Sequence, residues 1–206
     1  MRHRIGTRRL EPIGVVLAGG RGQRMGGSKA TVELCGRPLI SYPLQSLREV
    51  LGEVAIVAKP DTELPSLPGV TVWIEPPLPS HPLVGVVQAL ALAERRPVLV
   101  CAGDLPFVPP ELVARLATTD PGPAPAVVVA CGGDVQPLLG CYQQRALALL
   151  GPAARSAELP VRAAVAAIGP RLLQIDDSEV LFNVNAPEDL LQAAAILDRR
   201  RAASRT

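Results

Sequence analysis

The segment LAGGRGQRMGGSK, residues 17–29, gathers residue types that bind negatively charged groups. Five glycines, two arginines and a lysine stand here, directly after the apolar run IGVV. Glycine lets the backbone approach an anion closely and present N–H groups to it, and lysine adds a compact positive charge. Arg37 follows in the same region, where Glu33 is the acidic residue that opposes the cluster. The segment is therefore expected to hold phosphate groups.

Two widespread phosphate-binding loops do not match this segment. A Walker A loop ends in GK followed by Ser or Thr, whereas Lys29 follows a serine and precedes Ala30. The dinucleotide fingerprint GxGxxG fails too, because Gly26 lies one residue beyond the place of the third glycine. A glycine-rich turn that binds no ligand is the remaining simple alternative, and the clustered basic side chains argue against it.

Asp104 is the second candidate, because it ends the apolar run PVLVCAGD at residues 97–104. Ligands of parallel sheets collect at the carboxyl ends of the strands, so Asp104 is expected beside the glycine-rich segment. Mg²⁺ usually takes one or two carboxylates together with substrate phosphates. Asp104 is therefore predicted to bind Mg²⁺. The alternative is that it caps the helix expected near Pro109.

Apolar runs alternate with helical patterns along the chain. Strands are expected at 13–18, 54–58, 70–75, 97–104, 124–131, 136–142, 171–176 and 180–184, and helices at 39–51, 83–96, 109–117, 143–150, 161–168 and 185–200. Continuous Val, Ile and Leu strands that alternate with helices indicate an α/β fold with a mainly parallel sheet covered on both faces. Seven prolines at positions 60–82 indicate a long loop at the rim of that sheet.

The composition excludes several classes of protein. A chain of 206 residues fits one domain, and its four cysteines and two histidines lack the spacing of a zinc site. Eight of the 21 basic residues are arginines at the two ends, so the body is acidic, and we expect flexible tails at 1–11 and 199–206. An acidic body with 2% aromatic residues does not indicate nucleic-acid binding. Without a signal-peptide pattern or an apolar run of membrane-spanning length, we expect a cytoplasmic protein that does not bind membranes.

Five motifs of this chain resemble, in the same order, those of the molybdenum cofactor guanylyltransferase family, a MobA-like group of nucleotidyltransferases. The first is similar to the pattern LAGGxxxRMGxxK and consists of Leu17-Ala18-Gly19-Gly20, Arg24-Met25-Gly26 and Lys29. The others are LCGRPL at 34–39, HPLVG at 81–85, CAGDLP at 101–106 and NVNAPEDL at 183–190. The resemblance thus extends from residue 17 to residue 190.

This resemblance implies a fold, a reaction and a cofactor. The fold is a three-layer α/β/α, Rossmann-like nucleotidyltransferase sheet that forms a single domain. The enzyme would transfer GMP from GTP to the phosphate of molybdopterin, the molybdenum cofactor, and release pyrophosphate with the help of Mg²⁺. Gly19 favours GTP, because LAGG goes with guanine in this superfamily and LAAG commonly with cytosine. Transient contact with molybdoenzymes or their chaperones is a further implication.

The resemblance also implies roles for single residues. The residues that would bind the nucleotide are Leu17, Ala18, Gly19, Gly20, Gly26, Lys29 and Asp104. Arg24 and Lys29 would neutralise the triphosphate, and together with Asp104, the Mg²⁺ ligand, they would form the catalytic set. The residues that would lie toward the acceptor are Pro82, Leu83, Gly85, Asn183 and Asn185. Asn185 also fits a helix N-cap with Glu188 as its partner.

Three departures from the family's pattern fall in the regions of base and acceptor recognition. The family usually has an aspartate at the place of Pro76, an asparagine near Lys59 and a glycine at the place of His81. Glu75 and Lys59 are candidates to replace the missing groups, although neither occupies a matching position, and His81 is expected to be a loop residue. Three alternatives stay open: a cytidylyltransferase of the same cofactor, a nucleotidyltransferase for another small phosphate, and a cofactor-binding accessory protein without turnover.

Overall fold

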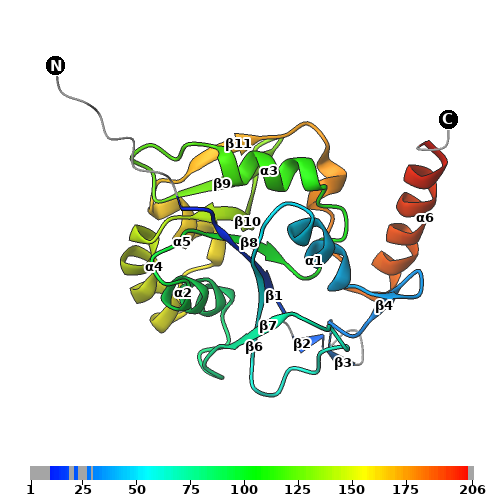
Figure 1. Cartoon of the computed structure of the whole chain (residues 1–206), viewed down its shortest axis with the longest axis horizontal. Coiled ribbons are helices and arrows are strands. Elements are labelled where there is room, and N and C mark those ends of the chain that lie inside the picture. Colours follow the sequence, from blue (N-terminus) through cyan, green and yellow to red (C-terminus); the bar gives the residue numbers. More distant parts are fainter. Residues whose placement is uncertain (1–9, 19–20, 23–26, 29, 204–206) are drawn as a thin grey trace.

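A seven-stranded sheet forms the centre of the protein (Figure 1). The computed structural model describes residues 10–18, 21–22, 27–28 and 30–203. Across the sheet the strands lie in the order β11 (Arg171–Gln174), β9 (Ala126–Cys131), β10 (Asp134–Tyr142), β8 (Val98–Ala102), β1 (Ile13–Leu17), β6 (Val54–Ala58) and β7 (Thr71–Ile74). β10 runs antiparallel to both of its neighbours, and the other neighbouring pairs are parallel. The prediction of a mainly parallel α/β sheet is confirmed.

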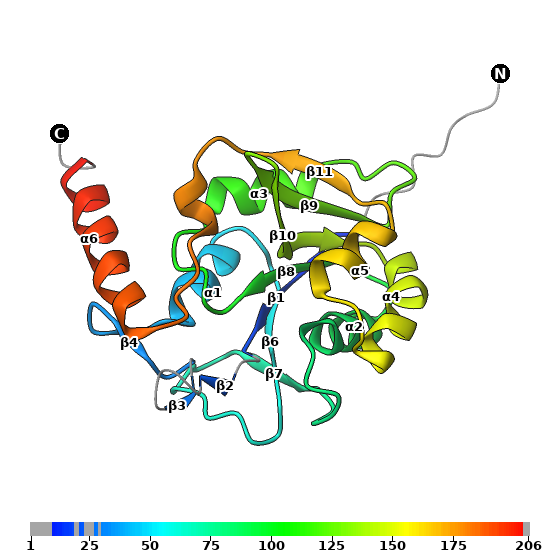
Figure 2. The same ribbon diagram turned by 180° about the vertical axis from the view of Figure 1, so that it is seen from behind.

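Helices cover both faces of this sheet (Figures 1 and 2). One layer consists of α1 (Ser41–Arg48) and α3 (Pro110–Thr118), and the other of α2 (Pro82–Leu92), α4 (Arg145–Ser156) and α5 (Val161–Ala167). Strand β1 shows why the central strands are apolar throughout. Val16 belongs to the apolar cluster of the first layer and Val15 to that of the second, and all five residues are buried. The predicted three-layer arrangement is therefore present.

A smaller apolar cluster holds the C-terminal helix α6 (Pro187–Ala203), which stands out from the layers in both views (Figures 1 and 2). Ala193 and Ile196 of this helix pack there with Phe107 and Val184. Two short ladders complete the fold, β2 (Arg21–Gly22) with β3 (Gly27–Ser28) and β4 (Glu33–Leu34) with β5 (Arg37–Pro38). No helix in the described ranges has the length and apolar character needed to cross a membrane.

The strand predicted at 180–184 is wrong. Its place is taken by the 3₁₀ helix η1 (Ser178–Leu181), which starts where the Asp177 carboxylate accepts an N–H two residues ahead at 2.9 Å. The buried residues of this stretch are Val180 and Val184, which are four positions apart. The helical turn takes the first two residues of the predicted strand, and Phe182 after it is extended but belongs to none of the sheets.

Helix α6 begins and ends differently from the prediction. The Asp189 carboxylate accepts the N–H groups of Asn185 and Ala186 at 2.7 and 2.9 Å, so Asp189 closes the start of the helix in place of Glu188. The helix also continues through residues 199–203, which the sequence places in a flexible tail. The described part of that tail is therefore helical.

Candidate active site

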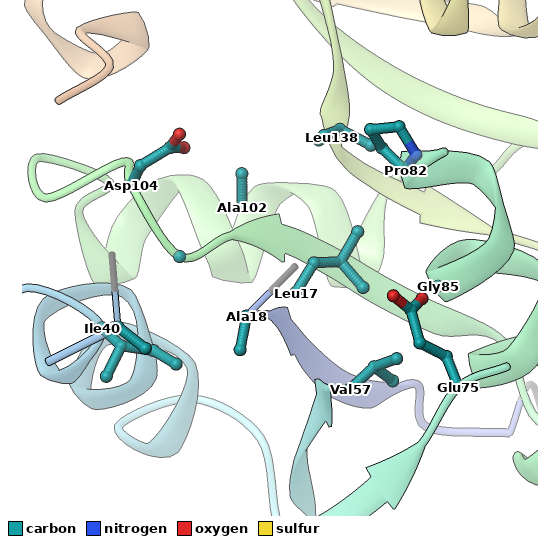
Figure 3. Close-up of a pocket in the computed structure, with 12 residues that line it drawn as sticks. Leu17, Ala18, Ile40, Val57, Glu75, Pro82, Gly85, Ala102, Asp104 and Leu138 are labelled. Carbon is teal, nitrogen blue, oxygen red and sulfur yellow. The ribbon is translucent and has the colours of Figure 1, made fainter. Parts of the chain in front are cut away.

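A pocket of about 160 Å³ opens at the carboxyl ends of β1, β6 and β8 (Figure 3). Its lining is mainly apolar and includes Leu17, Ala18, Val57, Ala102, Pro82 and Gly85. Two carboxylates also line it, Glu75 and Asp104, and Figure 3 places them on opposite sides. Because sheets of this kind bind ligands at the carboxyl ends of their strands, this pocket is the candidate active site.

Asp104 is brought to the pocket by a close contact between the ends of β8 and β1. The Gly103 N–H donates to the carbonyl of Leu17 at 3.0 Å, and a Cβ on Gly103 would lie 3.0 Å from that same oxygen. A glycine therefore lets the chain cross the end of β1, which puts the next side chain at the pocket wall. Helix α3 has Pro109 as its N-cap, and this residue makes no side-chain hydrogen bond to the start of the helix.

The glycine-rich segment starts and ends at this pocket. Ala18 and Ala30, which flank residues 19–29, both line it. Asp104 thus lines the same pocket as the two residues that flank the segment. The predicted binding and catalytic residues Gly19, Gly20, Arg24, Gly26 and Lys29 lie outside the described part of the chain.

Glu75, which the sequence offers as a candidate to replace a missing recognition group, lines this pocket. It directly follows β7, is 5% exposed, and is the one charged residue in the buried set of the described chain. Lys59 Nζ lies 3.5 Å from Glu75 Oε1 and donates to the carbonyls of Pro76 and Pro77 at 3.3 and 2.9 Å. Burial raises the pKa of Glu75, and the ammonium group of Lys59 acts in the opposite direction.

Helix α2 forms one wall of the pocket. His81 is its N-cap, since Nδ1 accepts the N–H of Leu83 at 3.4 Å while Nε2 lies 3.0 Å from the carbonyl of Leu159. His81 therefore has a structural role at the loop end. Pro82 and Gly85 line the pocket, whereas Leu83 is fully buried in the core. The helix turns the Leu83 side chain toward the sheet, so a contact of Leu83 with the acceptor stays a prediction that its side chain does not support.

A second, larger pocket of about 620 Å³ lies between the β9–β10 hairpin, η1 and α6. Asn183 lines it together with Gln136 of β10, whereas Asn185 lines neither pocket. Its charged residues form two ion pairs, Arg162 with Asp134 at 3.1 Å and Arg199 with Glu179. The predicted acceptor residues are therefore divided, with Pro82 and Gly85 in the first pocket and Asn183 in the second.

A backbone hydrogen bond links Asp104 of the first pocket to the segment that provides Asn183 to the second. The N–H of Val184, which follows Asn183, donates to the carbonyl of Asp104 at 3.0 Å. Strand β10 contributes Leu138 to the first pocket and Gln136 to the second.

The donor set at Asp104 fits a metal ion that is held together with substrate phosphates. No group of three or more His, Cys, Asp or Glu side chains able to hold a metal occurs among the described residues. Mg²⁺ needs only one or two carboxylates beside phosphate oxygens and water. Asp104 at the pocket wall supplies such a carboxylate, whereas Glu75 is already paired with Lys59.

Comparison with known proteins identifies the family. The family model described as a MobA-like NTP transferase domain matches residues 14–171. The chain belongs to this family. Molybdenum cofactor guanylyltransferase from Cereibacter sphaeroides is 35% identical over 189 residues, which cover 90% of this chain and 96% of that protein. A probable molybdenum cofactor guanylyltransferase from Chloroflexus aggregans is 33% identical over 197 residues, which cover 89% and 94% of the two chains.

Solved structures of nucleotidyltransferases share the fold of this MobA-like chain. Molybdopterin-guanine dinucleotide biosynthesis protein A from Archaeoglobus fulgidus superposes with a TM-score of 0.70 and 22% identity, over 91% of this chain and 99% of that chain. A 2-C-methyl-D-erythritol 4-phosphate cytidylyltransferase from Thermus thermophilus superposes with a TM-score of 0.65 and 23% identity, over 91% and 98%. Family and fold together make this chain a nucleotidyltransferase, a class of enzyme that generally uses a divalent metal ion.

Proposed function

We propose that this enzyme transfers GMP from GTP to the terminal phosphate of molybdopterin, with Mg²⁺ as the metal ion, and releases pyrophosphate. The observation that carries the proposal is the pocket shared by Asp104 and both flanks of the glycine-rich segment. The names of the two relatives described above support the choice of GTP and of the molybdenum cofactor as substrates.

The nucleotide occupies the first pocket in this proposal. Its base and ribose lie against Leu17 and Ala18, and its triphosphate follows the glycine-rich segment to Arg24 and Lys29. Asp104 would hold Mg²⁺, and the ion would supply positive charge to the phosphate groups of the nucleotide. Positioning and charge neutralisation of this kind supply most of the catalysis in phosphoryl transfer.

The acceptor occupies the second pocket. Asn183 offers its amide group to the pterin, and Arg162 and Arg199 offer positive charge to its phosphate. An oxygen of that phosphate attacks the α-phosphorus of GTP, so a new P–O bond forms while the bond between the α- and β-phosphates breaks. The attacking phosphate is largely ionised near neutrality, because its second pKa is about 6, and the reaction therefore needs no general base.

Pyrophosphate release tests this function directly. The enzyme, Mg²⁺ and molybdopterin are incubated with GTP, CTP, ATP or UTP in parallel, and we expect release with GTP alone. Release with CTP would favour the cytidylyltransferase, and release that requires another phosphate acceptor would favour a different nucleotidyltransferase. Tight nucleotide binding without any release would indicate the accessory protein.

Lys29→Ala tests the phosphate-binding segment. Loss of a charge that neutralises the triphosphate is expected to lower turnover by a factor of about 10² or more. Arg171→Ala, at the exposed start of the edge strand β11, is the control and is expected to keep wild-type turnover. Wild-type rates in Lys29→Ala would remove this residue from the mechanism.

A further inference from the structure

We propose that Glu75 selects the base of the nucleotide, by accepting hydrogen bonds from two adjacent N–H groups of guanine, those on N1 and on the 2-amino group. The inference rests on the proposed function, because it places the nucleotide base in the first pocket. It is carried by the burial of Glu75, by its contact with Lys59 and by the close packing of its carboxylate against Gly85.

Glu75 places a buried carboxylate among apolar side chains. The residue is 5% exposed and lines the pocket beside the apolar side chains of Leu17 and Val57. Burying a charged group is costly unless partners compensate, so a buried carboxylate in a pocket wall indicates a use for it. Hydrogen bonds to a charged acceptor are also stronger in this low-dielectric setting than in water.

The contact with Lys59 leaves most of the acceptor capacity of Glu75 for a ligand. A carboxylate offers about four lone-pair sites, and among the described residues Lys59 approaches one oxygen, Oε1, at 3.5 Å. Charge-assisted N–H···O bonds are usually about 2.7–2.9 Å long. Lys59 is held at the longer distance by its contacts with the carbonyls of Pro76 and Pro77. The ammonium group therefore balances the charge of Glu75 without saturating it.

Gly85 makes room for the other oxygen of the carboxylate. A Cβ on Gly85 would lie 2.8 Å from Glu75 Oε2 and 3.1 Å from the Leu17 side chain. Gly85 is a helical residue of α2 and lines the pocket together with Glu75 (Figure 3). The lack of a side chain at Gly85 therefore lets Oε2 pack against α2, which holds the carboxylate in place at the pocket wall.

Guanine is the base whose edge matches a carboxylate. Its N1–H and 2-amino N–H point in the same direction and can donate in parallel to an ionised carboxylate, which only accepts. Adenine and cytosine have an acceptor nitrogen next to their amino group, and uracil has a carbonyl on each side of its single N–H. These three bases would set a lone pair against Glu75 and leave a buried charge poorly satisfied.

Inosine and xanthosine triphosphates test the inference, because they change the guanine edge at one position. ITP lacks the 2-amino group, and XTP has a carbonyl in its place. With Mg²⁺, the wild-type protein is expected to bind GTP about 10-fold or more tightly than ITP, and XTP more weakly still. Isothermal titration calorimetry measures these affinities without any acceptor.

Glu75→Gln puts an N–H donor where the carboxylate accepts. We expect the ratio of GTP to ITP affinity to fall to about 1, and XTP binding to rise above GTP binding, because the amide can donate to the carbonyl of xanthine. Glu111→Gln, an exposed glutamate of α3, is the matched control and keeps the wild-type preference. Gly85→Ala keeps the carboxylate but crowds Oε2, so it is expected to lower the same ratio and serves if Glu75→Gln fails to fold.

Two results would overturn the inference. One is an unchanged ratio of GTP to ITP affinity in both variants. The other is an equal loss of affinity for GTP, ITP and XTP, which would indicate that Glu75 contacts the ribose. Failure of the proposed function looks different, since a protein that binds GTP selectively but releases no pyrophosphate with molybdopterin keeps Glu75 as the base selector and loses only the acceptor.

Discussion

The two pockets are built from different kinds of structure. The first is the smaller, about 160 Å³ against about 620 Å³, and its floor is formed by the ends of β1, β6 and β8, whose residues are nearly all buried. The second lies between a hairpin, a 3₁₀ helix and α6. The central core therefore fixes the shape of the first pocket, while the shape of the second depends on how α6 is docked.

Charge is also used differently in the two pockets. Glu75 in the first is buried beside apolar walls, so a ligand that fails to satisfy it meets a large penalty. The ion pairs of the second pocket are largely exposed, and pairs of this kind contribute about 0–1 kcal/mol to stability. One side of the fold can thus select its ligand strictly, while the other can rearrange around a larger ligand.

Asp104→Asn is expected to have the largest effect, because this residue lines the first pocket and is the proposed Mg²⁺ ligand. Loss of the carboxylate should lower turnover by a factor of about 10² or more and raise the Mg²⁺ concentration required. Pyrophosphate release over a range of Mg²⁺ concentrations measures both, with Asp61→Asn, an exposed aspartate in the loop after β6, as the control. An unchanged Mg²⁺ requirement would count against a metal-binding role.

Ile196→Ala is expected to affect the second pocket and spare the first. Ile196 is 5% exposed, lines the second pocket and packs in the small cluster that docks α6. Such a truncation costs about 2–5 kcal/mol in a well-packed site. Hydrogen exchange should then show lost protection in residues 187–203 with β1 unchanged, and acceptor-dependent turnover should fall while GTP affinity stays constant.

Leu191→Ala is the matched control for this experiment. Leu191 lies on the same helix but is 77% exposed, so its truncation should change stability by no more than about 0.5 kcal/mol. If Ile196→Ala also exposed the amides of β1, the two pockets would belong to one cooperative unit and the contrast between them would be lost.

The first pocket was also the easier of the two to predict from sequence, and the reason is physical. Strand β6 was predicted with its observed bounds, because a strand buried on both faces appears as an unbroken apolar run. The position of Asp104 followed from the rule that parallel strands present ligands at their carboxyl ends. Both signals are local in the sequence.

The features that sequence missed depend on contacts between distant segments. Burial of Glu75 results from the packing of α2 beside the end of β7, and no pattern around Glu75 reveals it. Leu83 stands in a motif between Pro82 and Gly85, yet the helix turns it into the core. The stretch 180–184 has the composition of a strand, but a side-chain cap at Asp177 starts a helical turn there.

Titration of Glu75 in the first pocket should make the stability of the protein depend on pH. This effect is smaller than those above, and its direction can be predicted. Burial raises the pKa of folded Glu75 above its ordinary value of 4.5, so between these two pKa values the folded state holds a proton that the unfolded state has released. Stability therefore falls as pH rises through this window. Relative to Glu75→Gln, the wild type is expected to gain stability as pH is lowered from neutral toward 4.5.

Selectivity for GTP over ITP should change in the opposite direction to stability when pH is lowered. A protonated Glu75 has lost acceptor capacity, so the ratio of GTP to ITP affinity is expected to fall as pH is lowered through the same window. Urea midpoints of both proteins and calorimetric affinities at neutral and mildly acidic pH give the two trends. A stability difference between wild type and Glu75→Gln that is independent of pH would show that Glu75 does not titrate differently on folding.

Arg199→Ala is expected to have the smallest effect on the fold, and it completes the comparison of charges. The side chains of Arg199 and Glu179 are 64% and 36% exposed. Loss of their ion pair should therefore lower stability by less than about 1 kcal/mol, and only at low salt. The side chains of Lys59 and Glu75 are only 12% and 6% exposed, so Lys59→Met should destabilise the protein more, and at any salt concentration. Urea midpoints at low and high salt measure both effects. A larger loss of stability in Arg199→Ala than in Lys59→Met would contradict this difference between the two ion pairs.

Arg199→Ala should nevertheless raise the KM for the acceptor, with the KM for GTP unchanged. Such a split would mean that charge in the second pocket serves the ligand rather than the fold, whereas the buried pair in the first pocket serves both.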